Sequence, residues 1–146
     1  MTNPLLKYYN DDTGFAPTYA TDRAAAMDIR AAHSVVIPGV KSAVIGTGLY
    51  FDIPEGYQIL MFGRSGLAAK NNIRLANSVG VIDEDYVDEL RVILFNDSVN
   101  DFTVNRGDRI AQIQLVPVVR ANQEELNVKP AQKGNRVGGL GSTGIK

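Results

Sequence analysis

Stretches in which every second residue is apolar recur along this chain and restrict it to a β-rich fold. The pattern runs through YQILMF (57–62), ELRVILFN (89–96) and RIAQIQLVP (109–117). An alternation of this kind places apolar side chains on one face of a strand. Further β-type runs, SVVIP, AVIGTGLYF and FTV, are separated by turn-forming pairs such as Pro-Gly and Asn-Asp. Many short strands divided by turns are typical of an all-β sandwich, barrel or jelly roll. Only SGLAAKNN (65–72) has the composition of a short helix.

The length and the charge of the chain narrow the classes of function. At 146 residues, we expect one domain with a core of its own. The formal net charge of −1 argues against partners held by bulk electrostatics, such as nucleic acid or an anionic membrane. The chain has no cysteine, which excludes disulfides and thiolate metal sites. No apolar run approaches the roughly 18–20 residues of a membrane span. The N-terminus has no basic segment followed by an apolar core, so we expect a cytoplasmic protein without an export signal.

The last part of the chain differs in composition from the rest. Residues 120–146 are polar and rich in Asn, Gln, Lys and Gly, so we predict a β domain over 1–119 and a C-terminal arm over 120–146 of the same single domain. The arm ends in GGLGSTGIK, which contains the G-x-G-x-x-G of a dinucleotide-binding turn. That turn needs a helix after it, and only two residues follow the last glycine. Composition leaves two interpretations open, a frayed terminus or a segment that orders on a ligand or a neighbouring subunit.

Two acidic residues are candidates for chemistry. Asp28 stands alone among apolar residues in AAAMDIRAA, and a buried carboxylate needs a cation, an arginine or a metal-bound water as its partner. Asp83 ends the apolar run VGVI, so we expect a carboxylate at the end of a buried strand, where partial desolvation and neighbouring charge tune the pKa of a general base. The other acids that follow Asp83 are more typical of a solvated turn, and they lack the spacing of an EF-hand. His33, the single histidine, belongs to no triad or metal-ligand pattern.

An anion-binding segment is suggested by GRSGLAAK. Arg64 offers a fork of donors suited to phosphate oxygens, Ser65 adds a hydroxyl, and Gly66 lets the backbone approach a ligand closely. The same tripeptide is also common in ordinary turns. Tyr86 lies close to Asp83 in the sequence, but an aromatic residue there could equally serve packing. Gln112 could be an ordinary residue of an edge strand.

The order of these segments is more specific than any one of them. AAAMDI, GRSGLA, GVIDEDY, RGDRIAQI and RVGGLGSTG, from about Ala25 to Gly144, resemble the five ordered motifs of the trimeric deoxyuridine triphosphate nucleotidohydrolases, the dUTPases. The resemblance implies a β jelly roll or distorted β-barrel with one short helix. It also implies a homotrimer in which each active site lies at a subunit interface and the C-terminal arm of one subunit closes over the site of another. In this interpretation the glycine-rich end is a phosphate lid.

The resemblance also implies an activity, the hydrolysis of dUTP to dUMP and pyrophosphate. This reaction limits uracil incorporation into DNA and supplies dUMP for thymidylate synthesis. Asp83 matches the general base, which activates water for attack on the α-phosphorus. Mg²⁺ is implied as a cofactor bound through the substrate phosphates and waters, with no direct protein ligand and with Asp28 in its outer coordination sphere.

The family pattern assigns the remaining site residues to two groups. The implied phosphate contacts are Arg64, Ser65, Gly66, Gln112, Arg136, Gly141, Ser142 and Thr143. The implied uracil and deoxyribose contacts are Asn77, Gly80, Val81, Ile82, Tyr86, Arg91 and Leu140.

Three positions depart from the usual family pattern. Met27 and Asp88 stand where small residues or glycine are usual, and Leu140 replaces the aromatic residue that stacks on the base. Arg136 also lies one residue closer to Leu140 than in the commonest form of the motif.

Two other functions remain as alternatives. A dCTP deaminase shares the fold and part of the pattern, and a non-catalytic nucleotide-binding regulatory trimer is the alternative from another class.

Overall fold

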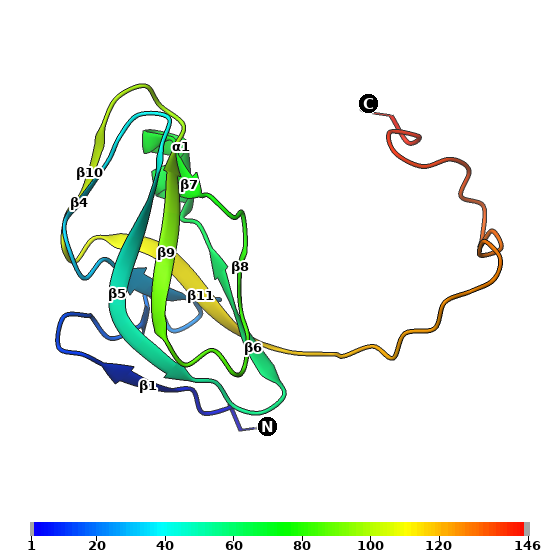
Figure 1. Ribbon diagram of the computed structural model, residues 1–146, viewed down its shortest axis with the longest axis horizontal. Helices are drawn as coiled ribbons and strands as arrows, with labels where there is room; N and C mark the ends of the chain where they lie inside the picture. Colours follow the sequence, from blue (N-terminus) through cyan, green and yellow to red (C-terminus); the bar gives the residue numbers. More distant parts are fainter. Residues whose placement is uncertain (1, 145–146) are drawn as a thin grey trace.

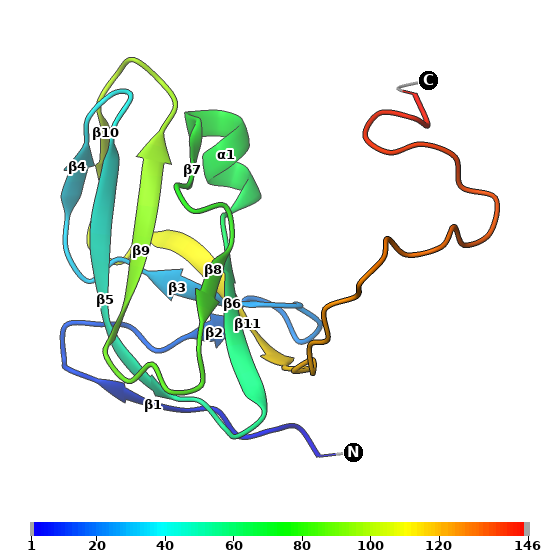
Figure 2. The ribbon, with the colours of Figure 1, turned by 45° about the vertical axis from the view of Figure 1, so that its right-hand side comes forward.

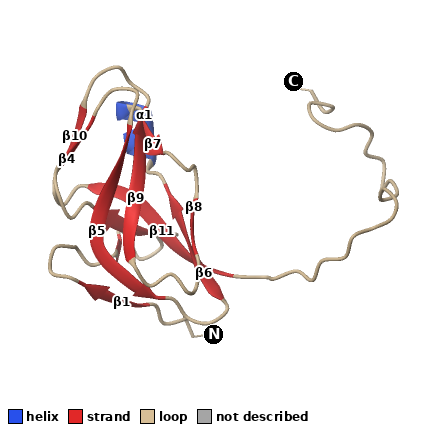
Figure 3. Cartoon of the chain, in the orientation of Figure 1, coloured by secondary structure: helices blue, strands red, loops and turns tan. Residues whose placement is uncertain are grey.

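The computed structural model describes residues 2–144 and contains eleven strands and one helix. Figure 3 shows how strands dominate the body of the protein, with a single helix at one end. In chain order, the elements are β1 (Lys7–Asn10), β2 (Thr18–Tyr19), β3 (Met27–Arg30), β4 (Val35–Ile37), β5 (Ser42–Asp52), β6 (Tyr57–Phe62), α1 (Ser65–Asn71), β7 (Ile73–Leu75), β8 (Gly80–Ile82), β9 (Glu89–Asn96), β10 (Phe102–Val104) and β11 (Arg109–Pro117).

Two antiparallel sheets face one another across the core. The first has the strand order β1-β5-β9-β7 and the second β2-β3-β11-β6-β8, while β10 and β4 form a separate pair. Figures 1 and 2 show the long strands β5 and β9 on one side and β3, β11 and β6 on the other. These ladders are open at their edges in the described part of the chain, so the jelly-roll form of the prediction applies rather than a closed barrel.

The core joins both sheets in one apolar cluster. Leu90, Val92 and Leu94 of β9 are at most 2% exposed, and Ala111 and Ile113 of β11 are fully buried. These are the residues that the period-two pattern assigned to the inner faces, because neighbouring side chains of a strand point to opposite sides of a sheet. The predicted all-β fold is therefore confirmed, and the helix lies within the stretch predicted for it. Strand β3 was not predicted: its four residues, MDIR, alternate between apolar and polar, but they follow three alanines and are too few for the pattern to stand out.

The chain leaves the sheets after β11. Every residue from 118 to 144 is exposed, and none lies in a helix or strand. Figures 1 and 2 show this segment extending away from the body of the protein. Strand β11 thus ends close to the predicted boundary at residue 119, but the role of 120–146 as an arm stays a prediction, and 145 and 146 lie outside the described residues. Within residues 2–144, no helix has the length and apolar character needed to span a bilayer.

Candidate active site

A buried carboxylate lies between two arginines at the surface of the second sheet. Asp28 of β3 is 8% exposed. Its Oδ1 is 3.6 Å from Nε of Arg64, and its Oδ2 is 3.5 Å from Nη1 of Arg109. Arg64 immediately precedes α1, and Arg109 begins β11. The prediction that Asp28 is buried is confirmed, and its partners are arginines, which balance the charge that burial would otherwise penalise.

The strand register explains how the residues of this region meet. Asp28 pairs with Gln112 across the β3–β11 ladder, and Gln112 pairs with Phe62 across the β11–β6 ladder. Directly opposed residues in an antiparallel pair point to the same face of the sheet. Gln112 donates from Nε2 to the carbonyl oxygen of Gly63 at 3.0 Å, which holds the segment after β6 close to β11.

A pocket of about 250 Å³ opens above this face, and we call it the phosphate pocket. Four of the predicted residues, Asp28, Arg64, Ser65 and Gln112, line it together with Arg109. Its remaining wall consists of four alanines, Ala20, Ala24, Ala25 and Ala26. A Cβ on Gly66, which follows Ser65, would meet no atom within 4 Å, so the space in front of that backbone is open. Small side chains and fixed donors leave room here for a polar ligand.

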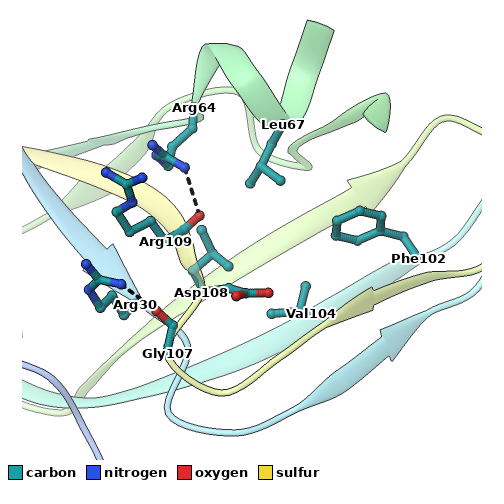
Figure 4. A pocket seen from close by; sticks show the side chains of 9 residues that line it. Arg30, Arg64, Leu67, Phe102, Val104, Gly107, Asp108 and Arg109 are labelled. Atoms are coloured by element: carbon teal, nitrogen blue, oxygen red, sulfur yellow. Dashed lines mark hydrogen bonds between the residues drawn. The ribbon is translucent and has the colours of Figure 1, made fainter. Parts of the chain in front are cut away.

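Sequence reasoning missed two basic residues of this region. Figure 4 shows Arg30, Arg64 and Arg109 along the neighbouring pocket of about 340 Å³, which Asp108 also lines. Arg30 donates from Nη1 to the oxygen of Gly107 at 2.7 Å, and Arg64 donates from Nη1 to the oxygen of Arg109 at 3.2 Å. A signal was present in the sequence, because Arg30 and Arg109 lie two and three residues from Asp28 and Gln112. Three guanidinium groups this close favour an anionic ligand.

A second pocket, of about 380 Å³, lies where β8 and β9 meet, and we call it the edge pocket. Asp83 lines it, as do all but one of the residues predicted to contact a nucleoside, namely Asn77, Gly80, Val81, Ile82, Tyr86 and Arg91. Its apolar walls are Val44, Met61, Leu90 and Ile93. The edge pocket and the phosphate pocket share no lining residue.

The backbone of β8 forms one side of the edge pocket. This strand is the last of its sheet and pairs only with β6 among the described residues. An edge strand presents N–H and C=O groups that its own sheet leaves unpaired. Gly80 lies opposite Met61, and a Cβ at Gly80 would come within 3.0 Å of Cβ of Met61. Glycine at position 80 therefore lets β8 lie this close to β6 without a displacement of Met61.

Asp83 follows the edge strand directly, and one expectation about it is wrong. We expected it to end a buried strand, but Val79 and Val81 are 41% and 61% exposed and Asp83 is exposed as well. The run alternates between the two faces of β8: Gly80 and Ile82 face inward, with Ile82 packed against the core, while Val79 and Val81 face solvent. Asp83 accepts a hydrogen bond at its backbone oxygen from the N–H of Tyr86 at 3.1 Å. The hydroxyl of Tyr86 donates to the oxygen of Glu89 at 2.8 Å, which fixes the ring beside the pocket.

Two of the three departures from the family pattern are accommodated locally. Met27 packs against the hydrophobic core, on the opposite face of β3 from Asp28, so its bulk does not enter the phosphate pocket. Asp88 is exposed and is not among the residues with positive φ, so the loop between β8 and β9 does not require glycine there.

The predicted lid residues lie apart from both pockets. Leu140 is fully exposed, and so are Arg136, Gly141, Ser142 and Thr143. Their segment carries its own small turns, in which Ser142 N–H donates to the oxygen of Gly139 and Gly144 N–H to that of Gly141, each at 3.1 Å. Figure 2 shows the segment well away from the sheets. In the single chain, the residues predicted to form the site therefore lie in two separate pockets, and those predicted to form the lid lie apart from both.

Comparison with known proteins agrees with the resemblance in the sequence. Residues 12–144 match the family model described as dUTPase. A deoxyuridine 5'-triphosphate nucleotidohydrolase of Brucella melitensis is 42% identical over 133 residues, which cover 88% of this chain and 83% of that protein. A mutant dUTPase of Staphylococcus bacteriophage 80alpha, solved with dUpNHpp, superposes with a TM-score of 0.87 at 23% identity and covers 98% of this chain and 100% of its own. A mutant dUTPase from phage phi11 of S. aureus, with a coordinated structural Mg(II) ion, superposes with a TM-score of 0.80 at 22% identity over 88% of this chain and 100% of its own.

Proposed function

The chain belongs to the dUTPase family, and we propose from its two pockets how it hydrolyses dUTP to dUMP and pyrophosphate. The observation that carries the proposal is the grouping of Asp83 with the nucleoside-contacting residues in the edge pocket. In the cell this activity limits uracil incorporation into DNA and supplies dUMP for thymidylate synthesis.

The phosphate pocket binds the triphosphate. Arg64 and Arg109 offer guanidinium donors, Ser65 offers a hydroxyl, and Gly66 leaves its backbone open to the ligand. Charge-assisted hydrogen bonds from arginine to phosphate are among the strongest in proteins. Asp28 acts through the arginines, because its two oxygens lie beside both guanidinium groups and fix their orientation.

The edge pocket binds uracil and deoxyribose. Uracil presents an N3–H donor flanked by two carbonyl acceptors, and the free edge of β8 offers backbone groups of both kinds. Cytosine presents a different pattern of donors and acceptors, so backbone groups of the pocket would lack hydrogen-bond partners. The binding of cytosine is therefore strongly disfavoured. Asn77 adds a side-chain amide, and the ring of Tyr86 packs on the sugar where a ribose 2′-OH would lie. Arg91 completes the group of nucleoside contacts through its backbone.

Asp83 is the general base. Its exposed carboxylate at the border of the edge pocket orients a water molecule and accepts its proton as the oxygen attacks the α-phosphorus in line with the departing pyrophosphate. In phosphoryl transfer the protein contributes mainly position and charge stabilisation. The arginines of the phosphate pocket stabilise the negative charge that develops on the leaving group.

The residues of the phosphate pocket fit a magnesium ion carried by the substrate. Among the described residues, no group of three or more His, Cys, Asp and Glu side chains is placed to hold a metal. The acid that lies in this pocket is Asp28, and its oxygens can accept hydrogen bonds from metal-bound water. When bound, Mg²⁺ would act as a Lewis acid that neutralises part of the phosphate charge, and Asp28 would hold its water ligands.

The assembled site contains more than one copy of the chain. The two pockets share no lining residue, and the lid residues Arg136, Leu140 and 141–143 are remote from both. A homotrimer with sites at the subunit interfaces, each closed by an arm from another subunit, brings these parts together. Glycines at 138 and 141 have positive φ, and such a backbone can wrap its N–H groups around phosphates.

A product assay tests the proposal. Pyrophosphate release is measured with dUTP, dCTP, dTTP and UTP, with and without Mg²⁺, and we expect release from dUTP alone. In ¹⁸O-labelled water the label should appear in dUMP, whereas label in pyrophosphate would contradict attack on the α-phosphorus.

The Asp83→Asn variant should bind dUTP without turning it over. Ammonia release from dCTP would indicate the deaminase instead, and binding without any turnover would indicate the regulatory trimer. Neither alternative is favoured, because the chain is 42% identical over 133 residues to a deoxyuridine 5'-triphosphate nucleotidohydrolase.

A further inference from the structure

A side-chain hydrogen bond joins the loop after β8 to a distant turn. Oε2 of Glu84 accepts a hydrogen bond from the N–H of Gly56 at 2.9 Å. Gly56 lies in the turn between β5 and β6, which Tyr57 closes by donating its N–H to the oxygen of Pro54 at 3.1 Å. Glu84 directly follows Asp83, so this contact acts on the backbone that carries the proposed base.

The backbone oxygen of Gly56 is also hydrogen-bonded, to the first residue of the C-terminal segment. Val118, the first residue after β11, donates its N–H to the oxygen of Gly56 at 2.8 Å. Both peptide groups that flank Gly56 are therefore hydrogen-bonded, one to the loop of Asp83 and one to the start of the segment 118–144. Gly56 has φ of +82°, a conformation that glycine adopts without strain. The turn is thus a fixed anchor for the side chain of Glu84.

The loop has few other attachments. The β6–β8 ladder ends at the pair Ile59 and Ile82, so the sheet does not hold Asp83 itself. The bonds made by Tyr86 stay within residues 83–89, between β8 and the start of β9. Within residues 2–144, Glu84 makes the single side-chain hydrogen bond from residues 83–88 to a residue outside this connecting segment. Asp83 and Glu84 also line a common pocket of about 490 Å³ with Gly56 and Val118.

We propose that Glu84 is a positioning residue for Asp83, and that it holds the base at its working distance from the α-phosphorus by anchoring the loop to Gly56. The inference rests on the proposed role of Asp83 as the base. A general base has to meet its water within hydrogen-bond reach, and a shift of about 1 Å in a catalytic group can lower a rate by about a hundredfold. Glu84 lines neither the edge pocket nor the phosphate pocket, so its loss should affect the chemical step rather than binding.

Three variants of the full-length chain test this role with dUTP. In Glu84→Ala the acceptor is lost, and kcat should fall by about ten- to a hundredfold while KM changes by less than about threefold. In Glu84→Gln the amide oxygen can accept the same hydrogen bond, and most of kcat should return. Glu55→Ala is the matched control, because Glu55 is an exposed carboxylate beside Gly56 in the same turn, and its kcat should equal that of the wild type. Melting temperatures of all three variants show whether each one is folded.

The outcomes separate this inference from the proposed function. If the wild type turns over dUTP and Asp83→Asn does not, but Glu84→Ala behaves like Glu55→Ala, the positioning role is wrong and the function stands. If Glu84→Gln is as slow as Glu84→Ala, the charge of Glu84 and not its hydrogen bond to Gly56 matters, and the inference is overturned. If the wild type itself releases no pyrophosphate from dUTP, both proposals are wrong. A kcat loss in Glu84→Ala that Glu84→Gln rescues supports the inference.

Discussion

Replacing Asp28 by Asn tests whether this carboxylate orients the arginines of the phosphate pocket. The two side chains have nearly the same shape, so the change removes charge and puts an amide in its place. Each ion pair of Asp28, at 3.6 Å to Arg64 and 3.5 Å to Arg109, is worth about 4–5 kcal/mol of Coulomb energy at an effective dielectric constant of about 20. The arginine side chains are 27% and 43% exposed, and water screens them. The desolvation of Asp28 offsets a further part of the Coulomb energy.

The net loss in stability should be about 2 kcal/mol, between the values for exposed and buried pairs. For a chain of this size, 1 kcal/mol corresponds to about 2–4 °C in Tm, so Tm should fall by about 4–8 °C. Two effects oppose each other in catalysis. Removing a negative charge makes the pocket more positive, which favours the triphosphate, but the guanidinium groups lose the partner that orients them. A hydrogen bond to a charged group contributes about 1.5–3 kcal/mol. We expect a misoriented guanidinium group to lose one such bond to a phosphate oxygen, and this loss should dominate and lower kcat/KM by about ten- to a hundredfold.

Thermal unfolding and initial-rate kinetics with dUTP measure both quantities. Asp22→Asn is the matched control, because Asp22 is exposed in the loop before β3 and the substitution changes the net charge by the same amount. If Asp28→Asn keeps the Tm of the control and binds dUTP as well as the wild type or better, Asp28 serves only to reduce the positive charge of the pocket. That result would refute the orienting role.

The remaining predictions concern the lid, the edge strand and acid stability. Leu140→Phe should lower KM for dUTP by up to about tenfold, because stacking on uracil adds about 0.5–1.5 kcal/mol; an unchanged KM in steady-state assays would show that the residue does not cover the base. Gly80→Ala places a Cβ 3.0 Å from Cβ of Met61 and should cost about 1–2 kcal/mol, seen as a lower midpoint in urea unfolding, with an unchanged midpoint arguing against tight β6–β8 packing. The hydrogen bond from the Thr13 hydroxyl lowers the pKa of Asp11 below its ordinary 3.8. Its contribution to stability is therefore present above about pH 3.8 and lost as pH falls through the lower folded-state pKa. The difference in Tm between the wild type and Asp11→Asn should accordingly shrink between pH 6 and pH 3, and a difference independent of pH would contradict this origin.

Much of the fold follows from local patterns in the sequence. The alternation in 89–96 and 109–117 identified the inner residues of β9 and β11, because the side-chain period of a strand is a property of a few consecutive residues. The helix at 65–71 is likewise indicated by its composition. Strand β3 was missed because its alternation extends over only four residues, MDIR, and because Asp28 is buried on its outer face by arginine partners from elsewhere in the chain.

For the candidate site, the order of the five motifs predicted which residues act, but not how they are grouped. Asp28 and Arg109 are far apart in the chain, and only the antiparallel pairing of β3 with β11 brings them within 3.5 Å. The exposure of Asp83 also depends on β8 being an edge strand, which its apolar sequence did not reveal. The anchor of Glu84 on Gly56 arises the same way, from a turn between two other strands.

Most of the long strands, the polar C-terminal segment and the candidate chemical groups can be predicted from the sequence, because they depend on neighbouring residues and on composition. The division of these groups into a phosphate pocket and an edge pocket without a common residue follows from the packing of the two sheets. The physical reason is that strand order and sheet edges are set by long-range hydrogen bonding and by burial in a shared core, and no single stretch of the chain encodes them.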